Sequence, residues 1–203
     1  MRIAIAAGRL EQPIWNWLKS QGLVNGSRHG RALVYTPRPG WEIAVVRGRD
    51  IPGLLRRGVV DVGILGRDVV EESPYELWMG PSLGFGQCRL MLALPNDMEA
   101  MPGGRFRVAT RYPRITRAWA EREGLLVDIV EMTGSVEVAP RLGIADAVVD
   151  VVETGETLRA NGLKPVATVL DSYAGLVTRP QEQALAERLT AAEEEMGRAA
   201  CEA

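Results

Sequence analysis

The sequence predicts an α/β protein with two lobes. Apolar runs alternate with amphipathic stretches along almost the whole chain, a pattern typical of strands that alternate with helices. The alternation is interrupted at Pro95–Gly104, which has the Pro, Gly and acidic content of an exposed loop, and then starts again. Two later apolar runs within Pro165–Pro180 are expected to return the chain from the second lobe to the first. We therefore expect lobe I to comprise residues 1–89 and 173–203, and lobe II residues 90–172.

Lobe I begins with strand and helix signals in turn. Short runs of Ile, Val and Ala indicate buried strands, and apolar residues spaced three or four apart indicate helices. The predicted strands are Arg2–Ala7, Ala32–Thr36, Trp41–Arg47 and Asp61–Leu65, and the predicted helices are Pro13–Gly22 and Asp50–Gly58. Trp15, Trp17 and Trp41 fit a core or an interface, and the core is favoured.

Lobe II repeats the pattern. The predicted strands are Arg105–Thr110, Leu125–Met132 and Ala145–Val152, and the predicted helices are Arg114–Gly124, Ser135–Gly143 and Gly155–Gly162. A charged helix, Gln181–Ala200, is expected after the chain has returned to lobe I.

Composition excludes several classes of protein. A formal net charge of -2 over 203 residues gives no signature of nucleic-acid or membrane binding. The cysteines Cys88 and Cys201 lie far apart, and the single histidine, His29, sits in a polar stretch, so we expect neither a disulfide framework nor a protein-held metal. No segment approaches the roughly 18 apolar residues of a membrane span, and the short N-terminal apolar run does not suit a signal peptide. A cytoplasmic protein is expected.

Arginines follow several of the predicted strands. Because ligands of open α/β sheets bind at the carboxyl ends of strands, these side chains could line one pocket for a polyanion. They are Arg9, Arg47, Arg49, Arg67 and Arg111. The alternative for each arginine is a solvated surface position.

The loop after the strand Ala145–Val152 has the features of a phosphate site. Thr154, Gly155, Glu156 and Thr157 offer two hydroxyls and backbone N–H groups at a helix start. The loop lacks the Lys of a nucleotide-triphosphate loop and carries acids, so a single phosphate monoester beside sugar hydroxyls fits better than a polyphosphate. The alternative is a plain helix N-cap at Thr154.

Four segments carry a resemblance to a known family. They are Arg49–Asp68, Leu83–Leu90, Ala109–Arg117 and Gly134–Leu163, in the family's order. The chain resembles the catalytic subunit of the ATP phosphoribosyltransferases, the first enzymes of histidine biosynthesis, nearly from end to end.

The resemblance implies transfer of the 5-phosphoribosyl group of 5-phosphoribosyl diphosphate (PRPP) to N1 of ATP, with Mg²⁺ on the phosphates. It implies a two-lobed fold of the type II periplasmic-binding-protein kind. The length is similar to that of the short form of the family, which works with a regulatory subunit similar to histidyl-tRNA synthetase. A homodimer at least, within a hetero-oligomer, is therefore expected.

Roles for individual residues follow from the same resemblance. The loop Thr154, Gly155, Glu156 and Thr157 is expected to hold the 5′-phosphate of PRPP, and Asp150 the ribose hydroxyls. Glu137 is expected either to bind PRPP or to cap a helix. Asp150 and Arg49 are expected to serve catalysis by positioning and charge stabilisation, without a covalent nucleophile. The residues expected to bind ATP or pyrophosphate are Arg9, Arg47, Arg49, Asp68, Thr110, Arg111, Tyr112 and Pro113.

The chain departs from the family at one corner of this site. The first strand of the family often ends in Lys before Gly-Arg-Leu, whereas Ala7 precedes Gly8 here. Either Arg9 or Arg49 is expected to supply that charge, or the site depends less on that corner. Two other functions stay open at this point: a non-enzymatic two-lobed binding protein for small molecules, and a phosphoribosyltransferase that acts on another base.

Overall fold

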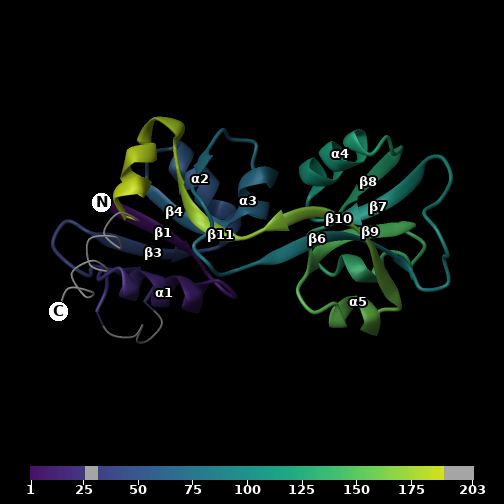
Figure 1. The fold of residues 1–203 in the computed structure, drawn as a ribbon, viewed down its shortest axis with the longest axis horizontal. Coiled ribbons are helices and arrows are strands. Elements are labelled where there is room, and N and C mark those ends of the chain that lie inside the picture. Colours follow the sequence, from purple (N-terminus) through teal and green to yellow (C-terminus); the bar gives the residue numbers. More distant parts are fainter. Residues whose placement is uncertain (26–31, 190–203) are drawn as a thin grey trace, which may run out of the picture. The chain divides into compact units, whose positions relative to one another are not determined.

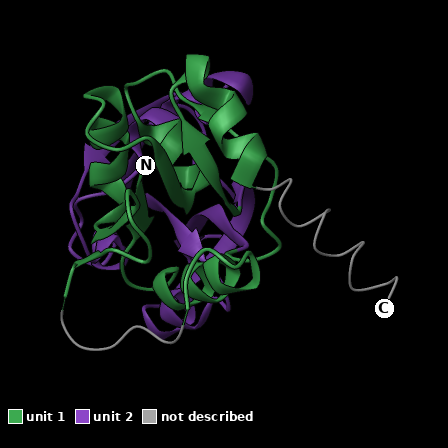
Figure 2. Cartoon of the chain, turned by 90° about the vertical axis from the view of Figure 1, so that its left-hand side faces the viewer, with its two compact units in different colours: residues 1–86, 173–203 green, residues 87–172 purple. Residues whose placement is uncertain are grey.

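The chain folds into two compact α/β units (Figures 1 and 2). The computed structural model describes residues 1–25 and 32–189. Unit 1 comprises Met1–Gly86 and Tyr173–Ala203, and unit 2 comprises Gln87–Ser172, so the first boundary falls after Gly86 rather than after residue 89. Residues 183–189 are helical, while His29, Cys201 and the rest of the expected C-terminal helix lie outside the described residues.

Unit 1 is built on a six-stranded mixed sheet. Its strand order is β2 (Val34–Tyr35), β3 (Glu42–Val46), β1 (Arg2–Ala6), β4 (Val62–Gly66), β11 (Ala174–Thr178) and β5 (Trp78–Met79). β1 runs parallel to β3 and β4, and β11 pairs antiparallel with β4 and β5. The segment that returns from unit 2 is therefore part of the sheet of unit 1.

Helices cover both faces of this sheet. Figure 1 shows α1 (Glu11–Ser20) on one face, and α2 (Ile51–Arg56) and α3 (Arg67–Glu72) on the other. Two short 3-10 helices, η1 (Gly48–Asp50) and η3 (Pro180–Glu182), precede α2 and follow β11. α1 buries Ile14, Trp15, Trp17 and Leu18, the three-to-four spacing that its sequence predicts. Trp15 and Trp17 therefore belong to the core, as expected, and Trp41 packs half-buried against it.

Unit 2 contains a five-stranded sheet with helices on opposite faces. Its order is β10 (Leu163–Ser172), β6 (Cys88–Pro95), β9 (Ala147–Val152), β7 (Phe106–Thr110) and β8 (Val127–Glu131). β9, β7 and β8 are parallel, and β6 and β10 extend the sheet antiparallel. α4 (Pro113–Arg122) and α5 (Glu156–Ala160) lie on opposite sides (Figure 1). Cys88 pairs with Ser172, so the chain enters and leaves unit 2 on neighbouring strands.

The alternation of side chains along β9 determines on which face of the sheet the carboxylate of Asp150 lies. Val149 packs on the α4 side with Trp119, whereas Val148 packs on the α5 side with Leu158. Successive residues of a strand point to opposite faces, so Asp150 shares the face of Val148. Each buried aliphatic side chain contributes about 1.5–3 kcal/mol to the stability of the folded state, and the two clusters together hold β9 in this orientation.

The helix predicted over Ser135–Gly143 is wrong. Only a single 3-10 turn forms, η2 (Val136–Val138), and hydrogen-bonded turns follow it. Pro140 explains the difference, because it has no N–H to continue a helix and its ring clashes with the preceding turn. The elements that the sequence did not predict include α3 and β5 in unit 1 and β6 in unit 2. Within the described residues, no helix has both the length and the apolar character needed to cross a bilayer.

Candidate functional site

Three of the expected turns of unit 1 follow strands that end on one edge of its sheet. β3, β1 and β4 are adjacent and parallel, with Ala6 opposite Val46 and Ile5 opposite Ile64. The turns after them contain Arg9, Arg47–Asp50 and Arg67–Asp68. Shared direction and register thus bring these predicted residues to one edge of unit 1.

The side chains at this edge differ in burial. Arg9, Arg47 and Arg49 are exposed, whereas Asp68 is only 6% exposed in the first turn of α3. Gly8 has φ +84°, a left-handed conformation that a side chain would strain, and it turns the chain toward Arg9. The edge therefore offers guanidinium groups to solvent beside a buried carboxylate.

Arg49 lines a pocket of about 580 Å³. The helical segment that begins at η1 supplies most of the lining, and the end of β3 and the turn after α3 supply the rest. The lining residues are Val46, Arg49, Asp50, Gly53, Leu54, Arg57, Pro74 and Tyr75. We call it the Arg49 pocket. Of the residues expected to bind substrate, only Arg49 lines it.

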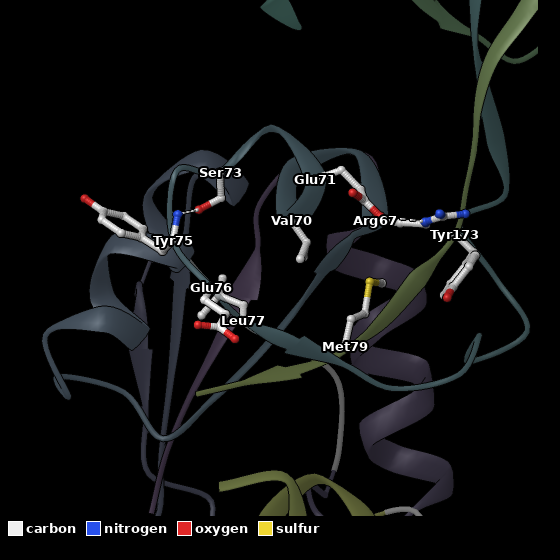
Figure 3. Close-up of a pocket in the computed structure, with 9 residues that line it drawn as sticks. All are labelled: Arg67, Val70, Glu71, Ser73, Tyr75, Glu76, Leu77, Met79 and Tyr173. Carbon is white, nitrogen blue, oxygen red and sulfur yellow. Dashed lines mark hydrogen bonds and ion pairs between the residues drawn. The ribbon is translucent and has the colours of Figure 1, made fainter. Parts of the chain in front are cut away.

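A neighbouring pocket of about 570 Å³ lies between α3 and β5 (Figure 3). Arg67 and Glu71 form an ion pair on its wall, with 3.3 Å between Nε and Oε1, and Met79 and Tyr173 lie nearby (Figure 3). Tyr75 lines this pocket as well as the Arg49 pocket. Arg67, one of the arginines expected to face a polyanion, is therefore paired with a carboxylate of its own helix.

In unit 2 the structure joins Asp150 to Arg111. Nη2 of Arg111 donates a hydrogen bond to Oδ1 of Asp150 over 2.7 Å, and the backbone N–H of Val151 donates to the same oxygen over 2.8 Å. The Asp150 side chain is 7% exposed and that of Arg111 34%. A buried carboxylate is thus held by a guanidinium group that reaches solvent.

Glu137 belongs to the electrostatic environment of this pair. Burial alone would lower the pKa of Arg111, but the hydrogen bond and charge of Asp150, with smaller contributions from Tyr112 and Glu137, raise that pKa above its ordinary value. Glu137 is the second residue of η2, which begins after Ser135, and Ser135 has φ +44°. A left-handed conformation is unfavourable for a serine, so packing around η2 must hold it.

Thr110 anchors the turn that carries Arg111. Its hydroxyl, at the end of β7, donates to the carbonyl oxygen of Val149 over 2.8 Å and accepts the N–H of Tyr112 over 2.9 Å. The side chain of Thr110 is fully buried, Tyr112 is 6% exposed, and Pro113 begins α4. Thr110 and Tyr112 are therefore internal supports of the turn, and Arg111 is the side chain that the turn presents.

The loop after β9 presents polar groups to solvent. Thr154, Glu156 and Thr157 are exposed, and Gly155 has φ +75°, where a side chain would be strained. The hydroxyl of Thr154 accepts the N–H of Glu156 over a long 3.4 Å, and Nη2 of Arg159 donates to the carbonyl of Thr154 over 3.1 Å. The loop has a defined turn with accessible hydroxyls.

The predicted site residues divide between the units. Asp150, Glu137 and the loop residues Thr154–Thr157 all lie in unit 2, together with Arg111. Arg9, Arg47, Arg49 and Asp68 lie in unit 1. Sequence reasoning missed two lining residues of the Arg49 pocket, Arg57 and Tyr75. The spacing of Arg57, eight residues after Arg49, was a usable signal, whereas nothing near Tyr75 pointed to it.

Comparison with known proteins gives a consistent result. The family model of ATP phosphoribosyltransferase (HisG) matches residues 47–196. The ATP phosphoribosyltransferase of Pyrococcus furiosus is 41% identical over 181 residues, which cover 87% of each chain. That of Stenotrophomonas maltophilia is 40% identical over 200 residues, and the match covers 90% of this chain but 65% of the relative.

Comparison with solved structures leads to the same family. A chain of the ATP phosphoribosyl transferase (HisG:HisZ) complex from Thermotoga maritima matches with a TM-score of 0.78 and 30% identity, over 96% of this chain and 99% of that one. Tv2483 bound to L-arginine matches with a TM-score of 0.64 and 17% identity, over 98% of this chain and 85% of that one. The second likeness is one of fold alone. Together with a likeness of fold to the substrate binding protein of an amino acid ABC transporter, at a TM-score of 0.57 and 11% identity, it agrees with the expected two-lobed fold.

Proposed function

The chain belongs to the ATP phosphoribosyltransferase family, and on that premise we propose that it transfers the 5-phosphoribosyl group of PRPP to N1 of ATP. The products are N1-(5-phosphoribosyl)-ATP and pyrophosphate, and the reaction is the first step of histidine biosynthesis. The observation that carries the proposal is the family match over residues 47–196, which spans parts of both units and includes Asp150 and its loop.

The reaction requires a displacement at the anomeric carbon of PRPP. The lone pair of N1 forms the new N–C bond, and the bond to the pyrophosphate oxygen breaks with its electron pair leaving on pyrophosphate. Positive charge develops on the ribose and negative charge on the leaving group, so fixed charges and correct alignment can supply most of the acceleration. N1 carries a lone pair at neutral pH, and neither a strong base nor a covalent nucleophile is needed.

In this proposal, unit 2 binds PRPP. The backbone N–H groups and hydroxyls of Thr154–Thr157 hold the 5′-phosphate, and Glu156 contributes its backbone. Asp150 accepts hydrogen bonds from the ribose hydroxyls while Arg111, already bonded to one of its oxygens, fixes the orientation of the carboxylate. The charge of Asp150, close to the sugar, would favour the cationic ribose of the transition state. Glu137 would act on the same cluster through Arg111.

In the same proposal, unit 1 binds the polyphosphates. Arg49, Arg47 and Arg9 offer exposed guanidinium forks, which suit bidentate contacts to phosphate oxygens. ATP and PRPP would enter as their Mg²⁺ complexes, so the ion arrives with the substrates. Arg49 would stabilise the charge that develops on pyrophosphate, which is the catalytic role we assign to it, and Asp68 would face the adenine nucleotide.

We also propose a regulatory partner. The similar Thermotoga maritima structure is a HisG:HisZ complex, and this chain covers almost all of the chain it matches there. A subunit similar to histidyl-tRNA synthetase is therefore the expected partner, with the catalytic chain at least a homodimer. Feedback by histidine would then act through that partner.

The test is an assay of the purified chain with ATP, PRPP and Mg²⁺, with and without a co-expressed synthetase-like subunit. We expect N1-(5-phosphoribosyl)-ATP and one equivalent of pyrophosphate, formed faster with the partner. Adenine, guanine, uracil and orotate in place of ATP should give no pyrophosphate. Binding of PRPP and ATP without any product under either condition would contradict the proposal and favour a binding protein.

A further inference from the structure

We propose that Arg57 is a second phosphate-binding arginine of unit 1, which acts together with Arg49 on a polyphosphate. The polyphosphate is either the triphosphate of ATP or the pyrophosphate group of PRPP, so the inference rests on the proposed function and deepens it. Both arginines line the Arg49 pocket, and none of the sequence motifs assigns a role to Arg57.

The spacing of the residues places them on one side of a helical segment. η1 and α2 follow each other without a break over Gly48–Arg56, and Arg57 is the residue that ends α2. Residues four apart on a helix are neighbours on one face. Arg49, Gly53 and Arg57 are four apart in series, and all three line the pocket. The row therefore consists of two guanidinium groups with a glycine between them.

Gly53, which lies between the two arginines in sequence, adds no side chain to the lining. A Cβ atom at this position would lie 3.7 Å from Nη1 of Arg57 and 4.0 Å from Cε2 of Tyr75. The guanidinium group of Arg57 and the ring of Tyr75 thus both approach the bare backbone of Gly53. Pro74 and Tyr75 come from the turn after α3 and form a further part of the lining, with Leu54 and Val46. A planar guanidinium beside an aromatic edge and a glycine floor is well placed to receive an oxyanion.

The charges around the pocket favour an anion. The side chain of Arg57 is exposed and makes no hydrogen bond or ion pair with the described residues. Asp50 is the one carboxylate among the lining residues, against the two arginines. A polyphosphate bound at the pocket would accept bidentate contacts from guanidinium groups.

Arg56 provides a matched control, because it differs from Arg57 in one respect. It is also exposed, stands one residue earlier on the same helix, and does not line the pocket. Arg56→Gln and Arg57→Gln remove the same charge from the same element. A general electrostatic effect of net charge would weaken anion binding equally in both variants.

The experiment is titration calorimetry of the full chain with inorganic pyrophosphate and inorganic tripolyphosphate at fixed ionic strength. We expect Arg57→Gln to weaken the binding of at least one of these probes about five-fold, as for the loss of a partly exposed charge-assisted hydrogen bond, and Arg56→Gln to change it by less than about two-fold. Arg49→Ala should weaken the same probe. Equal effects of the Arg56 and Arg57 substitutions, or no effect of Arg57→Gln, would overturn the proposal.

Steady-state kinetics then separate the two sources of polyphosphate. A rise in KM for ATP alone assigns Arg57 to the triphosphate, and a rise in KM for PRPP with weaker product inhibition by pyrophosphate assigns it to the other group. The calorimetry does not depend on turnover, so a chain that binds the inorganic probes through Arg57 but forms no product would contradict the proposed function and not the phosphate site. Thermal unfolding of each variant checks that the exposed substitutions leave the fold intact.

Discussion

Arg111 and Asp150 form an ion pair across the ends of two parallel strands, with 2.7 Å between Nη2 and Oδ1. Arg111 follows β7 directly and Asp150 lies within β9, the strand hydrogen-bonded to β7. The pair is thus a link between neighbouring strands as well as part of the candidate PRPP site. Its two roles make separable predictions about stability and activity.

For stability, we expect Arg111→Met to lower the free energy of unfolding by about 2 kcal/mol. The substitution leaves the Asp150 carboxylate buried without its counter-charge, and the exposure of Arg111 reduces the usual cost of breaking a buried pair. The double variant with Asp150→Asn should recover at least half of the loss. Urea unfolding of the natural chain, the two single variants and the double variant measures the coupling energy of the pair. Additive effects of the two substitutions would show that the pair is not coupled.

For activity, Thr157→Val should raise the KM for PRPP or lower kcat by about ten-fold, because it removes a hydroxyl from the proposed phosphate loop. Thr157 is exposed, so its stability should hardly change. Thr168→Val, an exposed threonine on the edge strand β10, serves as the control and should leave the kinetics unchanged. Unchanged constants in both variants would remove the Thr157 side chain from the site.

The stability of unit 2 should depend on pH through Asp146. Arg107 donates hydrogen bonds to this carboxylate from its side chain and from its backbone N–H, and these bonds lower the pKa of Asp146 below its ordinary value of 3.8. A lowered folded-state pKa gives stability that is present above pH 3.8 and is lost as the pH falls through the folded value.

Melting curves between pH 6 and pH 2.5 test this dependence on Asp146. Asp146→Asn should lower the melting temperature at pH 6, and its difference from the natural chain should shrink below about pH 4. Asp128→Asn is the matched control: the Arg105–Asp128 pair is more exposed, so its loss should change the melting temperature at pH 6 less than the loss of the Arg107–Asp146 pair. A difference that stays constant across the range would contradict the assignment to the Asp146 carboxylate.

Ser135→Gly should stabilise the chain by about 0.5 kcal/mol. The left-handed conformation of Ser135 costs about 1 kcal/mol or more, and glycine relieves that cost while adding entropy to the unfolded state. Ser135→Ala keeps the strain and should be no more stable than the natural chain. If Ser135→Gly also lowers kcat, the strained turn before Glu137 is needed for the reaction, which kinetics at saturating substrate would reveal.

Arg179 should be important for the position of α2. It lies at the end of β11, and its guanidinium group donates to the carbonyl oxygens of Leu55 and Val60 while it pairs with Glu182. Arg179→Met removes the charge-assisted hydrogen bonds to these carbonyl groups, of which that of Leu55 still accepts the N–H of Gly58, and should cost about 2 kcal/mol in urea unfolding. Because α2 carries Gly53 and Arg57 is its C-cap residue, the variant should also weaken tripolyphosphate binding. Unaltered binding would show that the pocket tolerates a shift of α2.

Most of the parallel strands and the turns after them were predictable from local sequence. Runs such as Ile3–Ala6 and Ala147–Val149 consist wholly of apolar residues, all of them buried, so their sequence alone indicates a strand. The pairing of Arg111 with Asp150 was not predictable, because it depends on β7 lying beside β9 in the sheet order. Sequence assigned these two residues to different substrates, and the structure places their side chains in contact.

The misassigned and missed elements have local causes. Pro140 interrupts the apolar spacing that predicted a helix over Ser135–Gly143, and a turn replaces most of it. α3 has only six residues and its two valines are adjacent, so no helical repeat is visible in its sequence. Tyr75 comes to the Arg49 pocket from the turn beyond α3, and such a contact exists only once the helix has formed.

The neighbouring positions at which the chain enters and leaves unit 2 make this unit a cassette. Cys88 opposes Ser172 at its base, and in unit 1 the N–H of Ala174 donates to the carbonyl oxygen of Phe85 over 3.1 Å. A short linker from Phe85 to Ala174 could therefore close unit 1 after excision, and residues 87–172 could be produced as one continuous fragment. Exchange of the cassette between relatives would then transplant the Asp150 loop without any cut through the sheet of unit 1.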